Sequence, residues 1–267
     1  MMISWEQFIY FAIAAVLLWA VGAWAAWREK TKLAYTYIIL GLVVFFSFIL
    51  MMWISLEHPP LRTMGETRLW YSFFLPLAGI IVYSRWKYKW ILSFSTILAL
   101  VFICINLFKP EIHSKTLMPA LQSPWFAPHV IAYMFAYAVF GVATLMAIFL
   151  LVKEKSLNSQ FSTLNSQLDD LVYVGLAFMT IGMLFGALWA KEAWGHYWSW
   201  DPKETWAAIT WFAYLVYVHY RQLPTHRPRL ALWVLLISFL LLQMCWWGIN
   251  YLPAAQGSSV HVYSMPS

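Results

Sequence analysis

The sequence predicts an all-α fold, that of a polytopic integral membrane protein with about eight transmembrane helices and both termini extracytoplasmic. Of its 267 residues, 63% are hydrophobic and only 10% are charged, whereas soluble domains carry roughly 25% charged residues. A spanning helix takes about 20 apolar residues, so eight helices with short connections use up residues 1–267 as a single transmembrane domain. We expect no separate soluble domain.

Eight apolar runs are the predicted helices, and the third and seventh of them are short. They cover residues 5–26, 34–55, 69–84, 90–108, 128–152, 171–190, 204–220 and 230–251. The first run lacks a basic leader and a small-residue cleavage site, so we expect a retained helix and not a signal peptide. Cys104 and Cys245 lie inside apolar runs, far apart in the sequence.

The orientation follows from the basic residues. Loops on one predicted side hold eleven of the 17 lysines and arginines, and loops on the other side hold six. The richer side should face the cytoplasm, which puts both termini outside. The formal charge of +6 comes from these short clusters between apolar runs. That pattern is typical of membrane topology and not of a nucleic-acid surface, so we expect no nucleic-acid partner.

The longest inner connection is predicted to be a polar loop, residues 153–170, with the near-repeat LNSQFST and LNSQLDD. In it, Leu157, Phe161, Leu164 and Leu168 are spaced as on one helical face. An interfacial amphipathic helix and a low-complexity linker both fit this pattern.

Tryptophan is concentrated between the sixth and seventh predicted helices. Five of the chain's 18 tryptophans fall within residues 194–211, in a stretch that begins WGHYWSWDPKETW. Indole rings favour the membrane interface, but an aromatic belt explains one or two of these residues and not such a density. Flat apolar faces with N–H donors suit a large planar hydrophobic ligand. The sequence therefore predicts a tryptophan-rich binding surface on the extracytoplasmic side.

Part of this stretch is also typical of the start of a helix. Asp201 fits an N-cap, Pro202 the first helical position and Glu204 the N3 position of a capping box. Capping is therefore favoured over ligand binding for Asp201. Lys203 suits two roles that the sequence does not separate, pairing with lipid headgroups or with a carboxylate of the bound molecule.

Three of the seven histidines lie where such a ligand needs them. His129 follows Pro128 at the outer mouth of the fifth predicted helix, and His261 lies in the outer tail. Two neutral imidazoles on opposite faces of an iron macrocycle give six-coordinate haem. His219 is 15 residues beyond Glu204, about 22 Å along a helix, so a haem that it binds is a second, inner one. A single histidine near an apolar span is otherwise more often an interfacial side chain than a ligand.

The stretch WGHYWSWDPKETWAAITWFAYLVYVHYR, residues 194–221, closely resembles the signature of the CcsA family of System II cytochrome c biogenesis. This family belongs to a haem-handling superfamily named for its tryptophan-rich WWD segment. The similarity extends to the flanks, Trp125–His129 and Gly248–His261, and PPLRTMGETRLWY, residues 59–71, resembles an outer loop of a bacterial branch. The resemblance covers most of residues 55–267 and is most specific in the tryptophan segment.

The resemblance implies a set of binding residues by position. It implies that His129 and His261 ligate haem b axially at an outer site, and that His219 ligates an inner haem. The haem-contacting residues that it marks in the segment are Trp194, Gly195, Trp198, Trp200, Asp201 and Trp206. It marks no dedicated acid–base catalyst, which suits a protein that acts by positioning.

The resemblance also implies a pathway and partners. In this family, haem passes from the cytoplasmic side of a bacterial inner membrane to the periplasmic tryptophan segment. There its vinyl groups meet the thiols of an apocytochrome c CxxCH motif. A partner, CcsB or ResB, supplies the second inner ligand, and this sequence contains no such domain. We therefore expect one half of a holocytochrome c synthase (a haem lyase), not self-sufficient, with CcsB/ResB, apocytochrome c and a thiol-reducing protein as partners.

Two other interpretations are open. A CcmC-type haem exporter shares the tryptophan segment and the outer histidines but passes haem to a chaperone. The Asp201–Glu204 continuation and His219 favour the CcsA interpretation over that one. A non-haem transporter or structural subunit is the third interpretation, but the repeated Gly/Pro-broken helices typical of transporters are not evident.

Overall fold

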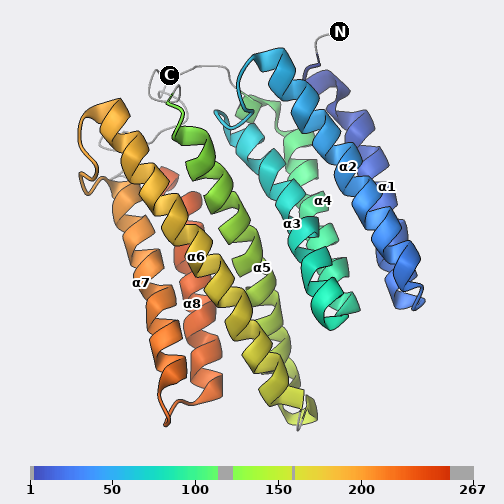
Figure 1. Cartoon of the computed structure of the whole chain (residues 1–267), viewed down its shortest axis with the longest axis vertical. Coiled ribbons are helices and arrows are strands. Elements are labelled where there is room, and N and C mark those ends of the chain that lie inside the picture. Colours follow the sequence, from blue (N-terminus) through green and yellow to red (C-terminus); the bar gives the residue numbers. More distant parts are fainter. Residues whose placement is uncertain (1–2, 114–122, 158–159, 253–267) are drawn as a thin grey trace. The chain divides into compact units, whose positions relative to one another are not determined.

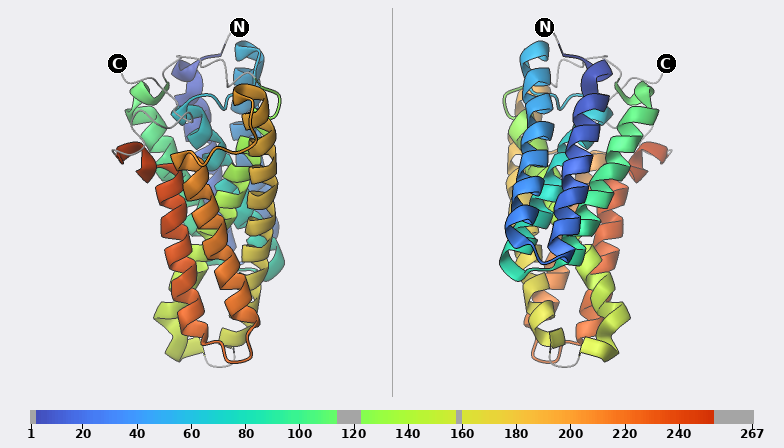
Figure 2. Two further views of the ribbon diagram at one scale, coloured as in Figure 1. Left: turned by 90° about the vertical axis from the view of Figure 1, so that its left-hand side faces the viewer. Right: turned by 90° about the vertical axis from the view of Figure 1, so that its right-hand side faces the viewer.

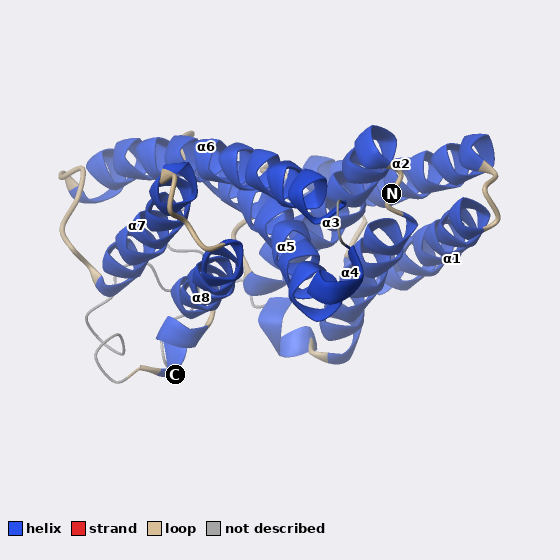
Figure 3. Ribbon diagram, turned by 90° about the horizontal axis from the view of Figure 1, so that it is seen from below, coloured by secondary structure: helices blue, strands red, loops and turns tan. Residues whose placement is uncertain are grey.

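The computed structural model describes residues 3–113, 123–157 and 160–252, and within these ranges the chain is helical without strands (Figure 3). This confirms the predicted all-α fold. The helices form two compact units, Met1–Leu117 and Met118–Ser267 (Figure 1). The prediction of one domain across 1–267 stays a prediction.

The first unit is made of four long helices. They are α1 (Phe8–Trp27), α2 (Thr31–Leu56), α3 (Met64–Trp86) and α4 (Lys89–Phe108), with short 3-10 turns at Trp5–Gln7 and Pro110–His113. Helix α1 packs on α2, and α3 packs on α4. The first pair packs closely because Gly41 has no side chain, and a Cβ placed there would lie 2.5 Å from the Trp19 ring. Small residues of this kind let helix backbones approach one another in membrane proteins.

The start of α3 is fixed by a capping box. The Thr63 side chain accepts from the Glu66 N–H, and Glu66 Oε2 accepts from the N–H groups of Thr63 (3.1 Å) and Arg62 (2.6 Å). Glu66 lies ahead of the span predicted at 69–84. Burial raises the pKa of its carboxyl above the ordinary value, and the hydrogen bonds from the two N–H groups oppose that shift.

The second unit holds the tryptophan segment. Its helices are α5 (Phe126–Leu157), α6 (Gln160–Trp194), α7 (Pro202–Gln222) and α8 (Pro228–Trp246), followed by a 3-10 turn at Gly248–Tyr251. Helix α5 packs on α6 and α8, and α7 packs on α8 and α6. The α5–α6 and α7–α8 connections lie at one end of this unit and the α6–α7 loop at the other (Figures 1 and 2).

For residues 153–170, predicted as a polar connection that is either a helix or a linker, the structure supports a helix over most of the segment. Helix α5 continues to Leu157 and α6 begins at Gln160, so most of this segment is helical. Two leucines of the predicted helical face, Leu164 and Leu168, are 5% and 0% exposed. The apolar face packs inside the unit instead of lying on a membrane surface, and that burial stabilises the polar sequence as the first turns of a long helix.

Six helices are long and apolar enough, by length and composition, to cross a membrane. They are Trp5–Trp27, Thr31–Leu56, Lys89–Phe108, Phe126–Lys153, Phe161–Trp194 and Pro228–Trp246. Helices α3 and α7 are more polar and do not meet the same measure among the described residues. In α3 most side chains are buried within the unit, so it needs less hydrophobic surface toward lipid. The chain is an integral membrane protein, while the count of eight spans and the placement of both termini outside stay predictions.

Candidate functional site

The tryptophan segment begins where α6 ends, at Trp194. Gly195 has φ +84°, a left-handed conformation that glycine adopts without steric cost. Its N–H donates to the Lys191 carbonyl at 3.0 Å, and Lys191 Nζ donates to the Gly195 carbonyl at 2.7 Å. The glycine thus closes the helix in the usual C-terminal manner and turns the chain into the α6–α7 loop.

The other end of the loop is the predicted capping box. The Asp201 carboxylate accepts from the Glu204 N–H at 2.9 Å, and Glu204 Oε2 accepts from the Asp201 N–H at 3.2 Å. Pro202 is the first residue of α7, and both carboxylates are buried. The capping role inferred for Asp201 is therefore confirmed, while a haem contact of this residue stays a prediction.

Between these two ends, Trp200 is held in an unusual conformation. Its φ of +59° lies in the left-handed region, which is rare for bulky residues. Glu204 Oε2 accepts from the N–H on either side of it, at 2.7 Å from Ser199 and 3.2 Å from Asp201. The Thr205 hydroxyl donates to the Trp200 carbonyl at 3.1 Å. These contacts fix the loop so that the indole ring of Trp200 projects outward, 67% exposed.

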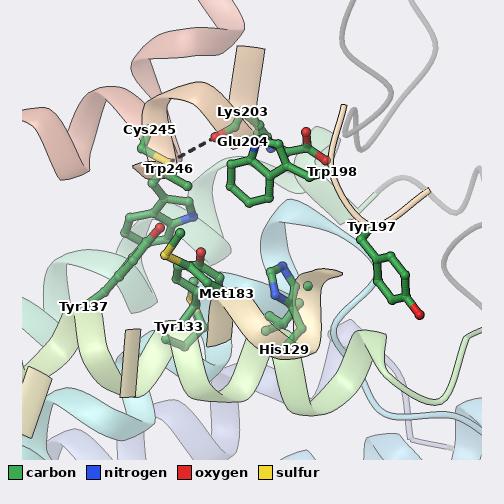
Figure 4. Close-up of a pocket in the computed structure, with 14 residues that line it drawn as sticks. His129, Tyr133, Tyr137, Met183, Tyr197, Trp198, Lys203, Glu204, Cys245 and Trp246 are labelled. Atoms are coloured by element: carbon green, nitrogen blue, oxygen red, sulfur yellow. Dashed lines mark hydrogen bonds between the residues drawn. The ribbon is translucent and has the colours of Figure 1, made fainter. Parts of the chain in front are cut away.

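A pocket lies beneath this loop within the second unit (Figure 4). It contains about 710 Å³ not filled by protein atoms, part of it open to the surroundings. Pockets for small molecules and cofactors are lined mostly by hydrophobic and aromatic side chains. Aromatic and sulfur-containing side chains form much of the wall, namely Tyr133, Tyr137, Met183, Trp198, Cys245 and Trp246. The pocket is therefore suited to a flat, largely apolar molecule.

His129 contributes an imidazole to this pocket. It lies in the first turn of α5, and its ring points from that helix into the pocket, toward Trp198 (Figure 4). Its Nδ1 is 2.8 Å from the carbonyl oxygen of Gly182 on α6. A carbonyl only accepts, so Nδ1 carries the hydrogen and Nε2 carries the lone pair. Histidines that ligate metals are commonly oriented by such a hydrogen bond to the other ring nitrogen.

The five tryptophans of the segment have different surroundings. Trp198 lines the pocket, and its Nε1 is buried without a hydrogen-bond partner in the described part of the chain. Trp194 packs against Trp189 of α6, with ring centroids 4.9 Å apart. Trp211 donates from Nε1 to the Thr180 hydroxyl at 2.9 Å and so joins α7 to α6. Of this segment, Trp198 is thus the tryptophan in the described wall of the pocket.

Lys203 brings a cation to the same pocket. Its side chain lines the wall, and its carbonyl oxygen accepts a long hydrogen bond from the Cys245 thiol at 3.8 Å. Lys203 lies ahead of the span predicted at 204–220, and burial lowers the pKa of its ammonium group while the Asp201 carboxylate opposes that shift.

His219 lies far from this pocket, near the other end of α7. Its side chain is exposed, and its Nδ1 donates to the Leu215 carbonyl of the same helix at 2.8 Å. The lone pair of Nε2 is therefore directed away from the helix backbone. The expectation that His219 does not share a site with His129 agrees with their places at opposite ends of the unit.

The opposite face of α7 is anchored to α6. Arg221 pairs with Asp169 through two nitrogens, Nε to Oδ1 at 2.9 Å and Nη2 to Oδ2 at 2.6 Å. The Tyr217 hydroxyl donates to the same carboxylate at 2.7 Å. Since His219 is two residues from each, it lies roughly 200° around the helix from both. The ion pair thus sets the rotation of α7 that turns His219 outward.

Sequence reasoning found some of this site and missed the rest. His261 lies outside the described residues, so its place opposite His129 stays a prediction. The pocket residues Tyr133, Tyr137, Met183 and Trp246 were not singled out, because each lies within a predicted apolar span. A tyrosine in such a span is a signal that could have indicated a cavity, because its hydroxyl needs a polar partner there.

The chain is similar to known proteins over most of its length. The model of the family described as "Cytochrome C assembly protein" matches residues 63–255, a range that includes the whole described pocket and His219. The chain belongs to this family. Its matched range ends before His261.

Curated relatives narrow the type of family member. The cytochrome c biogenesis protein CcsA of Marchantia polymorpha is 30% identical, over 81% of this chain and 82% of that protein. The CcsA of Solanum bulbocastanum is 37% identical over 80% of each, and that of Panax ginseng is 34% identical over 88% of this chain and 85% of the relative. These relatives confirm the resemblance to the CcsA family noted from residues 194–221.

Proposed function

We propose that this CcsA-type chain binds haem b in the pocket beneath the tryptophan loop and presents it for covalent attachment to apocytochrome c. Family membership assigns the chain to cytochrome c biogenesis. The observation that supports haem as the bound molecule is the orientation of His129 in the pocket wall, where Nδ1 donates to the Gly182 carbonyl and Nε2 therefore carries the lone pair that would ligate iron.

Iron ligation by His129 is consistent with the rest of the pocket. Trp198 and Trp246 offer flat apolar faces, and the buried Nε1 of Trp198 and the ammonium group of Lys203 offer donors to carboxylates at the edge of the macrocycle. We propose His261 as the axial ligand on the opposite face of the ring. Two neutral imidazoles shield the iron and fix the ring, so that the protein acts through positioning.

The chemistry that this positioning serves is an addition reaction. Each cysteine thiol of the CxxCH motif adds across one haem vinyl group, so that sulfur bonds to one carbon and hydrogen to the other. Electrons balance without an external oxidant, but both cysteines must be reduced, which calls for a thiol-reducing partner. The ring of Trp200 projects outward from the loop above the pocket, where it would contact the incoming apocytochrome.

For the inner haem, we propose His219 as one axial ligand and a histidine of a CcsB/ResB-type partner as the other. Ile209, Phe212 and Val216 are exposed on the same stripe of α7, at spacings of three and four residues. An ionisable side chain on an otherwise apolar stripe is costly when it faces lipid. A partner that covers this stripe removes the cost, so the chain would be one half of a holocytochrome c synthase.

The topology gives a direction to haem movement. The lysine and arginine bias supports an orientation with the α5–α6 and α7–α8 connections on the cytoplasmic side and the tryptophan loop outside. We propose that the chain lies in a bacterial inner membrane, takes haem near His219 and delivers it to the periplasmic pocket at His129.

The test is cytochrome c maturation in cells that co-express this chain, a CcsB/ResB-type partner and a reporter apocytochrome c. His129→Ala and His219→Ala are each expected to lower the yield of haem-attached reporter at least about tenfold. Imidazole in the medium should restore part of the His219→Ala yield, because it fills the vacant coordination position.

A matched control exists on the inner side of the second unit. Both ring nitrogens of His226 are engaged, Nδ1 with the Leu223 carbonyl and Nε2 with Arg221, each at 2.7 Å. His226→Ala should therefore not respond to imidazole. Maturation at the wild-type level in both His129→Ala and His219→Ala would refute the proposed function.

A further inference from the structure

The ring of His129 is held by helix α6 at two points. The first is the hydrogen bond from Nδ1 to the Gly182 carbonyl, 2.8 Å. The second is the flat surface of Gly186, one turn further along α6, where a Cβ would lie 2.7 Å from Nδ1 and 2.8 Å from Cε1 of the same ring. Any side chain at position 186 would therefore occupy the space that the imidazole now fills.

The same face of α6 meets two other rings of α5. A Cβ at Gly175 would lie 2.6 Å from the Phe140 ring, and one at Gly182 would lie 3.0 Å from the Tyr133 ring. Glycines 175, 182 and 186 are spaced seven and four residues apart, so they share one helix face. This contact between α5 and α6 is of the small-residue kind that membrane helices use to approach closely. Among its three rings, that of His129 is the imidazole proposed above as the iron ligand.

The hydrogen bond to Gly182 determines which nitrogen of His129 faces the pocket. A helical carbonyl has a second lone pair and can accept from a side chain in addition to its own helix. Because Gly182 has no side chain, its carbonyl can be reached by a ring on the neighbouring helix. The bond fixes the Nδ1–H tautomer and raises the basicity of Nε2, as carbonyl and carboxylate partners do for metal-bound histidines.

We propose that Gly182 and Gly186 are positioning residues for iron ligation, which hold the His129 imidazole with Nε2 toward the haem pocket. Gly182 supplies the acceptor that sets the tautomer, and Gly186 supplies the space in which the ring lies. This inference rests on the proposed function and adds to it the part of α6 that prepares the ligand.

The experiment compares Gly186→Ala with Gly175→Ala in the full chain, purified with its CcsB/ResB-type partner. Both substitutions push one methyl group of α6 against an α5 ring, at 2.7 and 2.6 Å, so they disturb the packing of the helices to a similar extent. Gly186→Ala moves the imidazole, whereas Gly175→Ala moves only Phe140. The readouts are the haem-to-protein ratio, the absorption spectrum with and without added imidazole, and the melting temperature.

We expect Gly186→Ala to weaken haem retention at the outer site about 10- to 100-fold, the usual effect of losing a ligand's supporting contact. The spectrum should change from six-coordinate low-spin toward five-coordinate, and imidazole should reverse the change. Gly175→Ala should keep the wild-type spectrum even where its melting temperature falls as much. In a His129→Ala background, Gly186→Ala should have no further effect on haem.

Equal haem spectra for Gly186→Ala and Gly175→Ala would overturn the proposal. It would also be overturned if Gly186→Ala caused the same loss of haem in the His129→Ala background as in the wild-type background. Should the Gly186→Ala protein fail to accumulate, His129→Ala must restore its accumulation, and a lack of restoration also overturns the proposal. A wild-type spectrum in His129→Ala alone would instead refute the ligand assignment of the proposed function.

Discussion

Replacing Asp169 by Asn should destabilise the second unit strongly. The side chains of Asp169 and Arg221 are only 13% and 10% exposed, and the carboxylate accepts from Arg221 Nε, Arg221 Nη2 and the Tyr217 hydroxyl. Asparagine keeps the shape of the side chain but removes its charge. The guanidinium group of Arg221 is then left partly buried without its counter-ion, and one donor meets an amide NH₂ in place of an oxygen.

The size of the effect follows from this burial. Removing one partner of a buried ion pair costs about 3–5 kcal/mol. The Asp169–Arg221 pair retains some contact with solvent near the end of the helices, so we expect the lower value, about 3 kcal/mol. In a unit of this size, each kcal/mol lost from the free energy of unfolding lowers the melting temperature by about 2–4 °C. The melting temperature of Asp169→Asn should therefore fall by about 6–12 °C.

The assay is thermal unfolding of the purified full-length protein, followed by tryptophan fluorescence. Glu29→Gln is the matched control, because Glu29 also pairs with a single cation, Lys89 at 2.8 Å, but is 80% exposed. Exposed ion pairs contribute little to stability, so this control should melt at the wild-type temperature. The reasoning is refuted if Asp169→Asn melts at the wild-type temperature, or if Asp169→Asn and Glu29→Gln lower the melting temperature by the same amount.

Three further changes test the loop and the first unit. Glu204→Gln weakens the acceptor that the N–H groups of Ser199 and Asp201 share, so the variant should lose about 1–2 kcal/mol of stability and lower the yield of haem-attached reporter. A melting curve like that of the wild type would contradict this prediction. Trp200→Gly relieves the strain of the left-handed φ, so its melting temperature should not fall below that of the wild type. Reporter maturation should nevertheless decrease, because the indole ring is lost. Maturation at the wild-type level would show that Trp200 is not part of the site. Burial raises the pKa of the Glu66 carboxyl above 4.5, so the folded protein loses stability as the pH rises from that value and the carboxyl ionises. The melting temperature of Glu66→Gln should therefore fall less over this pH range than that of the wild type. An unchanged slope of melting temperature against pH would contradict this prediction.

Hydropathy and capping patterns predicted the helices well. The capping box of Asp201 and Glu204 depends on residues three apart in the sequence, so local chemistry alone determines it. For the segment 153–170 a helix and a linker both stayed open, because its polar residues fit either. Leu164 and Leu168 become buried only when the helices of the unit assemble, and a single sequence does not show that packing.

Of the predicted binding residues, His129 and Trp198 line the described pocket, and the geometry of that pocket was not predicted. The density of tryptophan marked the segment, but which ring faces the pocket depends on the left-handed backbone of Trp200 and on the hydrogen bonds that Ser199 and Asp201 donate to Glu204. Tyr133 and Met183 come from helices that look uniformly apolar, where periodicity does not separate a pocket wall from a core. The Gly182–His129 hydrogen bond joins residues 53 positions apart, and no local pattern indicates it.

The central claim is that His129 ligates haem iron through Nε2. The most direct measurement is the visible absorption spectrum of the purified complex carrying His129→Ala, with His58→Ala as the control. His58 also has Nδ1 near a backbone carbonyl, that of Pro59 at 3.0 Å, but lies in the first unit. We predict that His129→Ala weakens or shifts the Soret band, that imidazole restores it, and that His58→Ala leaves it unchanged. A Soret band of wild-type position and intensity in His129→Ala would contradict the account.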